Sequence, residues 1–161
     1  MKSVFCLIAG LSIFSAAGNA ADEYSVGFGV GVRYSGLGLS FARITDTSMG
    51  YFSVGCLGWS SDSLAQESNC GFSVGYLSRF SFSNPHISLG VNFNVSNNRF
   101  DGQIDGSLSE VDDLEYRYGL GLNYHFNGIG AKGMIAGISA YARDANGRSE
   151  PRLGISLGYH W

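Results

Sequence analysis

Apolar residues alternate with small or polar residues in short runs along most of this chain. The clearest run is the last one, where glycine, serine or histidine separates Leu153, Ile155, Leu157, Tyr159 and Trp161. Successive side chains of a β-strand point to opposite faces. The run therefore predicts a strand with one apolar face and one small or polar face.

The same alternation predicts seven further strands. The eight strands are expected at residues 24–34, 37–42, 50–59, 72–82, 87–95 and 114–126, within 129–143, and at 151–161. In the third strand Phe52, Val54 and Cys56 form one face, yet Tyr51, Leu57 and Trp59 sit on the other, which predicts a β-bulge. Residues 60–69, 96–113 and 144–150 are expected to form long loops, whereas the other connections are short. Strands of about 9–11 residues, with short turns at one end and longer loops at the other, are typical of transmembrane barrels.

If successive strands run in opposite directions, the residues of the apolar face can be arranged by their height along the barrel, and aromatic and aliphatic residues then fall at different heights. Aromatic residues fall near both ends of the strands, including Tyr34 at the outer end and Phe82 at the periplasmic end, and aliphatic residues fall between them. The opposite face is glycine, serine, asparagine and charged residues, which is too little apolar volume for the core of a soluble barrel. We predict an all-β, eight-stranded antiparallel up-and-down transmembrane β-barrel.

This pattern resembles the bacterial outer-membrane β-barrels, and the small eight-stranded proteins of the OmpA and OmpX type in particular. In that family a C-terminal strand with alternating apolar residues and a terminal aromatic is the signal read by the outer-membrane assembly machinery. The resemblance assigns this signal to Leu153, Ile155, Leu157, Tyr159 and Trp161. It also implies a bacterial outer-membrane location, among membrane lipid and lipopolysaccharide. The sequence contains no loop motif specific to one subfamily.

Residues 1–20 are expected to be a signal peptide, and residues 21–161 the barrel. Lys2 precedes an apolar run too short to span a bilayer, and small residues at 18–20 supply a cleavage site. Beyond this leader the chain has nine basic and thirteen acidic residues, a net charge of about −4. That balance argues against a nucleic-acid partner.

Two cysteines, Cys56 and Cys70, follow the leader. An exported chain with two cysteines favours a disulfide. If the third and fourth strands pair so that Val54 faces Phe72, then Cys56 faces Cys70. Two unpaired thiols are the alternative.

Charged residues on the inward face allow two interpretations. The predicted lumen charge network consists of Arg33, Arg79, Glu115, Arg117 and Arg152. It is either a satisfied ion-pair network centred on Glu115, or a constriction that selects anions. Eight strands normally leave an interior filled by side chains, yet the many glycines and serines of this face leave room for a water-filled cavity.

Three functions are considered. The first is a structural or surface-interaction barrel whose acidic extracellular loops, residues 60–70 and 96–113, contact lipopolysaccharide or a host component. The second is a narrow pore for small solutes or ions. The third is a lipid-modifying enzyme, because lipid A deacylases of this barrel class use a His-x-Ser pair with a glutamate.

His86 and Ser88 match the His-x-Ser letters, but no suitably spaced glutamate follows. We therefore expect no enzymatic activity. His86, His125 and His160 lie on separate strands without ligand spacing, so no metal or other cofactor is expected.

Overall fold

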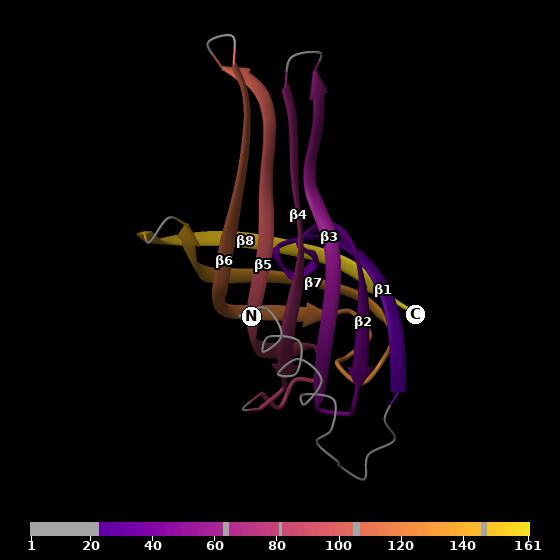
Figure 1. Cartoon of the computed structure of the whole chain (residues 1–161). Helices are drawn as coiled ribbons and strands as arrows, with labels where there is room; N and C mark the ends of the chain where they lie inside the picture. Colours follow the sequence, from indigo (N-terminus) through magenta and orange to yellow (C-terminus); the bar gives the residue numbers. More distant parts are fainter. Residues whose placement is uncertain (1–22, 63–64, 81, 105–106, 146–147) are drawn as a thin grey trace, which may run out of the picture.

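The computed structural model describes residues 23–62, 65–80, 82–104, 107–145 and 148–161, so the expected leader lies outside the described residues. Within them, eight antiparallel strands form a closed barrel in which each strand pairs with its sequence neighbours and β1 pairs with β8 (Figure 1). The strands are β1 (Glu23–Gly31), β2 (Gly36–Ile44), β3 (Ser48–Asp62), β4 (Ala65–Ser78), β5 (Ile87–Ile104), β6 (Ser107–His125), β7 (Gly133–Ala145) and β8 (Arg148–His160). This confirms the eight-stranded up-and-down barrel that the alternation predicted. In the described part, no helix is long and apolar enough to cross a membrane.

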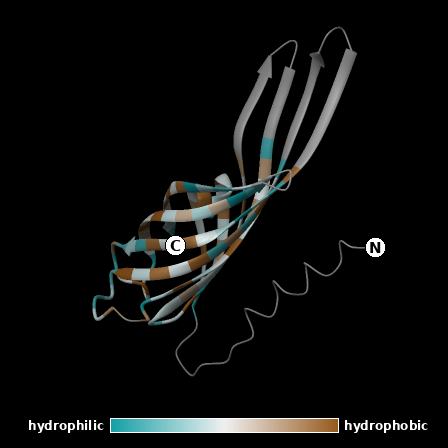
Figure 2. Cartoon of the chain, turned by 90° about the vertical axis from the view of Figure 1, so that its left-hand side faces the viewer, coloured by the Kyte–Doolittle hydropathy of each residue, from teal (hydrophilic) through white to brown (hydrophobic). Residues whose placement is uncertain are grey.

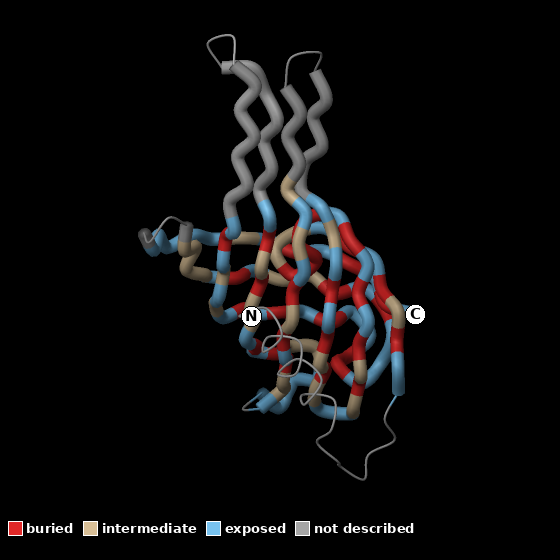
Figure 3. The backbone as a smooth tube through the Cα atoms, viewed as in Figure 1, coloured by how far each residue is buried: buried red, intermediate tan, exposed pale blue. Residues whose placement is uncertain are grey.

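Buried and exposed residues alternate along the barrel strands (Figure 3). Most exposed positions of the barrel strands are apolar. Hydrophobic residues alternate with paler, less hydrophobic ones along these strands (Figure 2). Leu153 is 85% exposed and Ile155 is 75% exposed, whereas Ser40 and Ser53 on the inward face are 0% exposed. A soluble protein has the opposite arrangement, with apolar side chains inside and polar ones outside. Exposed apolar side chains fit a barrel whose outer wall faces hydrocarbon.

Strand pairing aligns the outward residues into bands. Aliphatic side chains pair across the middle of the wall, as in Leu39 with Val54 and Leu122 with Ile138. Most of the aromatic residues expected in the girdles are exposed on the outer wall or just beyond a strand end. Tyr34 instead points into the lumen, and Phe82 lies in the turn after β4.

Two pairs of strands continue beyond the barrel as long hairpins, which Figure 1 shows projecting from one end. Residues 60–69 and 96–113 were expected to be loops, but β3 continues to residue 62 and β5 to residue 104. β4 and β5 also pair with each other from Ala65 opposite Gly102 down to the barrel. The four strands therefore form one sheet that rises from the barrel wall. We call this end of the molecule the hairpin end, and the opposite end the turn end.

The turn between β4 and β5 is longer than the alternation suggested. The fourth strand was expected to run through residue 82, but β4 ends at Ser78. Phe80 adopts a positive φ of 24° and is 93% exposed, so the chain has already left the sheet. Arg79, expected in the lumen, lies in this turn, where its backbone N–H donates to the carbonyl of Thr47 at 2.9 Å.

Two other strand boundaries are refined. The strand of uncertain register within residues 129–143 is β7, which turns Ile135 inward and Ile138 outward. β8 begins at Arg148, three residues before Pro151. The bulge expected in the third strand appears as a shift of the β3–β4 register between Cys56 and Trp59.

The lumen at the turn end is filled by apolar side chains. The buried cluster comprises Ala42, Ile44, Met49, Tyr51, Leu77, Ile129 and Ile135. Ile129 comes from the turn between β6 and β7, and its N–H donates to the carbonyl of Pro85 at 2.9 Å, so this turn folds under the barrel. The inward face therefore holds more apolar volume than its sequence pattern indicated.

Candidate functional site

The connection between β1 and β2 folds into the barrel as a short 3-10 helix, η2 (Val32–Tyr34). A strand was expected to run to residue 34, with Tyr34 on the outer wall, but β1 ends at Gly31. Gly31 and Gly36 have φ angles of 111° and 109°, which glycine adopts readily and which turn the chain inward. Tyr34 is 0% exposed and Arg33 is 3% exposed. The first connection at the hairpin end is therefore a plug and not a surface loop.

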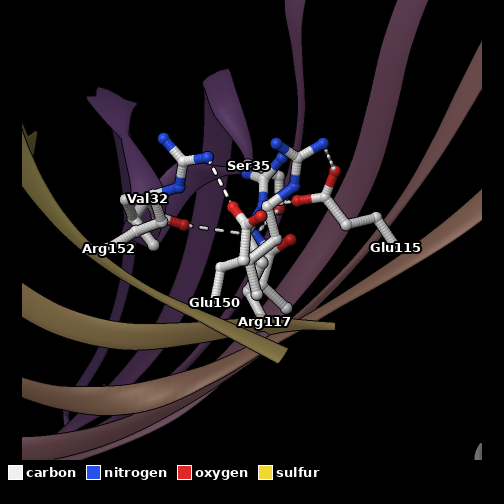
Figure 4. A network of polar contacts seen from close by, with 8 residues as sticks. Val32, Ser35, Glu115, Arg117, Glu150 and Arg152 are labelled. Atoms are coloured by element: carbon white, nitrogen blue, oxygen red, sulfur yellow. Dashed lines mark hydrogen bonds and ion pairs between the residues drawn. The ribbon is translucent and has the colours of Figure 1, made fainter. Parts of the chain in front are cut away.

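Hydrogen bonds from two strands hold η2 in the lumen. Asn94 of β5 donates its side-chain amide to the carbonyl of Val32 at 3.2 Å and to Ser35 Oγ at 2.7 Å. The backbone N–H of Arg33 donates to Ser156 Oγ of β8 at 3.2 Å. Figure 4 draws Val32 and Ser35 in one view with Glu115 and Arg117. These bonds satisfy backbone and side-chain groups that burial would otherwise leave unpaired.

Inward-facing glycines make the space that η2 occupies. A Cβ atom added at Gly29 or Gly158 would overlap the Tyr34 ring, and one added at Gly38 or Gly55 would overlap the Tyr34 carbonyl oxygen. The glycine-rich inner face suggested a water-filled cavity in the sequence. In the structure, part of that space is a socket for an aromatic residue. Two of these glycines lie on β1 and β8, the strands that close the barrel.

Arg33 extends along the lumen toward the apolar cluster. Its guanidinium carbon lies 4.4 Å from the centroid of the Tyr51 ring and 5.7 Å from that of Tyr34. Its Nη2 contacts Met49 Sδ at 3.2 Å. Stacking on an aromatic face stabilises a cation. Arg33 is thus inward, as expected, but it lies on the aromatic ring and belongs to η2 and not to a strand.

Glu115 is the centre of a smaller ion-pair network than the sequence indicated. It is 0% exposed and pairs with Arg117, and with Arg143 at 2.8 Å. Arg152 is 52% exposed and pairs instead with Glu150 at 2.6 Å (Figure 4). The structure therefore brings Glu115 and Arg117 together and adds Arg143. It leaves Arg152 at the rim.

Arg79 is not part of this network, because it lies in the turn at the other end of the barrel. Arg143 and Asn94 were missed in the sequence. Arg143 belongs to the strand whose register was uncertain, and Asn94 is one of several similar asparagines on the inward face of β5.

The histidines line the turn end and bond to hydroxyl or carbonyl groups. His125 Nε2 lies 2.8 Å from Ser88 Oγ, and His160 lies 3.3 Å from both Ser25 Oγ and the Tyr34 hydroxyl. His86 Nδ1 donates to the carbonyl of His125 at 2.7 Å. Ser88, the second residue of the His-x-Ser pair, is 0% exposed and contacts His125. Among the described residues, no group of three His, Cys, Asp or Glu could hold a metal ion.

Cys56 and Cys70 form a disulfide on the outer face of the β3–β4 pair. The register matches the one inferred from the sequence, with Val54 opposite Phe72 and Cys56 opposite Cys70. The bond lies where the long hairpin leaves the barrel. It therefore ties the hairpin to the wall at its base.

The C-terminal strand presents its apolar side chains outward. Leu153, Ile155, Leu157, Tyr159 and Trp161 are all exposed. The backbone N–H of Trp161 donates to the carbonyl of Val26 at 2.9 Å, and the N–H of Val26 donates back at 3.3 Å. The last residue thus closes the seam between β8 and β1.

Comparison with solved structures shows the fold. The N-terminal β-barrel domain of Pseudomonas aeruginosa OprF is similar over 86% of this chain and 96% of its own, with a TM-score of 0.53 and 15% sequence identity. Ail, the attachment invasion locus protein of Yersinia pestis, is similar over 89% of this chain and 100% of its own, with a TM-score of 0.51 and 14% identity. No protein-family model and no curated protein matches the sequence. The fold is that of the small eight-stranded outer-membrane β-barrels.

Proposed function

We propose that this chain is an outer-membrane barrel that holds a β-sheet above the membrane for contact with another surface. The observation that carries the proposal is the sheet formed by β3, β4, β5 and β6 beyond the barrel. The barrel below it is filled by η2 and by the apolar cluster. Such an arrangement supports a rigid anchor for a protruding sheet.

Both outer edges of the protruding sheet offer backbone groups for pairing. β2 pairs with β3 only as far as Cys56, and β7 pairs with β6 only from Tyr116 onward. Residues 107–115 of β6 therefore pair with β5 on one side alone. An open edge can accept an extended strand of a partner. The β5–β6 hairpin also carries the five acidic residues of 96–113, which favour a basic partner surface.

We also propose a location and a route of assembly for the barrel, from its apolar outer wall and its last strand. We place it in the bacterial outer membrane, in contact with lipid and lipopolysaccharide, because its outward band is apolar. We infer export through a cleaved leader, residues 1–20. We also infer that the outer-membrane assembly machinery reads the alternating residues of β8 that end at Trp161.

The filled lumen supports the surface role over a narrow pore. Arg33, Tyr34 and Ser35 occupy the lumen at one level and the apolar cluster occupies it at another. Ion conduction needs a continuous wet path, and side chains that occupy the lumen at two levels argue against such a path. The buried position of Ser88 likewise gives no support to an enzyme of the His-x-Ser kind.

The test combines conductance with binding. The full chain, refolded in bilayers, is expected to give no discrete conductance steps. It is also expected to bind immobilised basic serum proteins, because the acidic hairpin favours a basic partner surface. The matched control is a variant in which residues 58–68 and 98–112 are replaced by tight turns, so that the barrel remains and the sheet is removed. Loss of binding in this variant supports the proposal. Reproducible conductance, or equal binding by both proteins, would contradict it.

A further inference from the structure

The guanidinium of Arg33 is a buried positive group whose hydrogen-bonding capacity is incompletely used. Arg33 is 3% exposed, and its Nε and Nη1 have no hydrogen-bond partner in the described protein. Its polar contact is to a thioether sulfur, Met49 Sδ, which is a weak acceptor. A buried cation is strongly unfavourable unless a counter-charge and hydrogen bonds accompany it.

The acids near the plug do not balance the arginines. Among the described residues, Glu115 is the one fully buried carboxylate. It already pairs with both Arg117 and Arg143. Arg33 is therefore a third guanidinium in a lumen whose described buried negative charge comes from one residue. The local potential in this part of the barrel favours a negative ion.

A small cavity lies beside Arg33. Its volume is about 10 Å³, and its lining includes Arg33, Tyr51, Leu77, Asn92, Asn123 and Ser139. The polar lining residues carry a guanidinium, two amides and two hydroxyls, all of which can donate hydrogen bonds, and no carboxylate is among the lining residues. A cavity of roughly 10–15 Å³ holds one water-sized particle. The space thus holds one water-sized particle and excludes sulfate or phosphate. A chloride ion is slightly larger in radius than water, so it fits with a small outward shift of the lining side chains.

We propose that this cavity binds a single chloride ion as the counter-ion of Arg33. A water molecule would satisfy an N–H group but would leave the positive charge uncompensated inside a wall that faces hydrocarbon. Chloride does both, and the amides of Asn92 and Asn123 and the Ser139 hydroxyl complete its hydrogen bonds. Because Arg33 belongs to η2, the ion also fastens the plug to β5, β6 and β7 on the far side of the lumen.

The direct test is diffraction from crystals of the full chain refolded in bromide. Bromide replaces chloride and is identified by its anomalous signal. We expect one peak within about 3.5 Å of the Arg33 guanidinium, a hydrogen-bonding distance. A water molecule at this position, or no density, would overturn the proposal. This measurement uses the unmodified protein, so it remains decisive even if variants of Arg33 fail to fold.

Thermal unfolding supplies the second test. At equal ionic strength, the protein in chloride is expected to unfold a few degrees higher than in methanesulfonate, which is too large for the cavity, because a ligand that binds only the folded state stabilises it. Arg33→Met should abolish this difference. Arg152→Met removes an equal charge at the rim and should preserve it. A bromide peak without any chloride dependence would indicate an adventitious ion only, and would also overturn the proposal.

Discussion

The Tyr34 ring occupies the space that a side chain at position 158 would need inside the barrel. The energetic coupling between these two positions can be measured. The three atoms that a Cβ at Gly158 would approach most closely all belong to the Tyr34 side chain. Gly158→Ala is expected to lower the free energy of unfolding by about 1–3 kcal/mol, as overpacking does. In the Tyr34→Ala background the same substitution should cost much less, because the conflicting ring is gone. Denaturant unfolding of the four proteins in detergent gives the coupling energy.

The control for this cycle is Gly121→Ala. Gly121 also faces the lumen, but a Cβ there would approach Ser139 and not Tyr34. Its cost should therefore be the same with and without Tyr34. Equal costs of Gly158→Ala in the two backgrounds would mean that the plug is not seated against β8.

Glu115 is the residue on which the ion pairs of the lumen depend. Glu115→Gln leaves Arg117 and Arg143 without their shared carboxylate. Removing one partner of a buried ion pair typically costs about 3–5 kcal/mol. Glu150→Gln breaks the exposed pair with Arg152 and should cost below about 1 kcal/mol. Denaturant midpoints of the two variants decide the matter, and similar values would show that Glu115 is not structurally central.

At the scale of residues, the sequence predicts which side of the barrel wall a side chain faces better than it predicts which residues that side chain contacts. Alternation placed Glu115 and Arg117 inward, and both lie on β6, where side-chain direction follows from strand geometry. Arg33 also lies inward, but it belongs to η2, so strand alternation does not account for its direction. Alternation placed Tyr34 outward because it assumed that β1 continued. The signal that η2 turns inward was present in Gly31, Gly36 and the shortness of the connection. Its consequence depends on glycines of β8, more than a hundred residues away.

At the scale of elements, strand existence was predictable and strand ends were not. β5 and β6 continue through polar residues that were expected to be a loop, because β4 supplies a pairing partner beyond the barrel. Backbone pairing there does not require an apolar face. Conversely, the alternation of aromatic residues in residues 78–82 continued past the true end of β4, where the chain turns.

The disulfide between β3 and β4 is expected to stabilise the folded protein. Cys56 and Cys70 close a loop of about 15 residues, for which the chain-entropy model predicts a stabilisation of about 3 kcal/mol. Reduction, or the double substitution Cys56→Ser and Cys70→Ser, should lower the free energy of unfolding by about this amount and leave the barrel closed. An alkylating reagent should not label the folded, unreduced protein. Stoichiometric labelling under those conditions would show that the bond does not form.

At the scale of the whole molecule, the barrel was predictable because most strands repeat the same rule. Apolar residues alternate along most of the expected strands, and the long connections fall at one end, apart from the short connection between β1 and β2. A closed barrel is the sheet that satisfies its own backbone in lipid. The filled lumen was not predictable in the same way. It depends on Ile129 from a turn and on Tyr34, which the alternating pattern had placed on the outer wall but which lies in the connection after β1.

Trp161 is expected to act in two separate ways. Its backbone closes the barrel, and its side chain is expected to be read during delivery to the membrane. Its backbone bonds with Val26 close the β1–β8 seam whatever side chain it carries. Trp161→Ser should therefore change the stability of the refolded barrel by only about 1–2 kcal/mol, since its ring is 53% exposed. If the assembly machinery reads the terminal aromatic, the same substitution should strongly reduce the amount of protein in the outer membrane of cells.

Tyr124→Ser is the matched control for the Trp161 experiment. Tyr124 is a similarly exposed aromatic at the turn end of β6, outside the C-terminal strand. It should cost a comparable amount of stability and leave the amount of membrane-inserted protein nearly unchanged. Heat-dependent gel mobility of membrane fractions measures the inserted barrel. Equal losses for the two variants would mean that the side chain at position 161 acts through stability alone, and that β8 carries no assembly signal in its last residue.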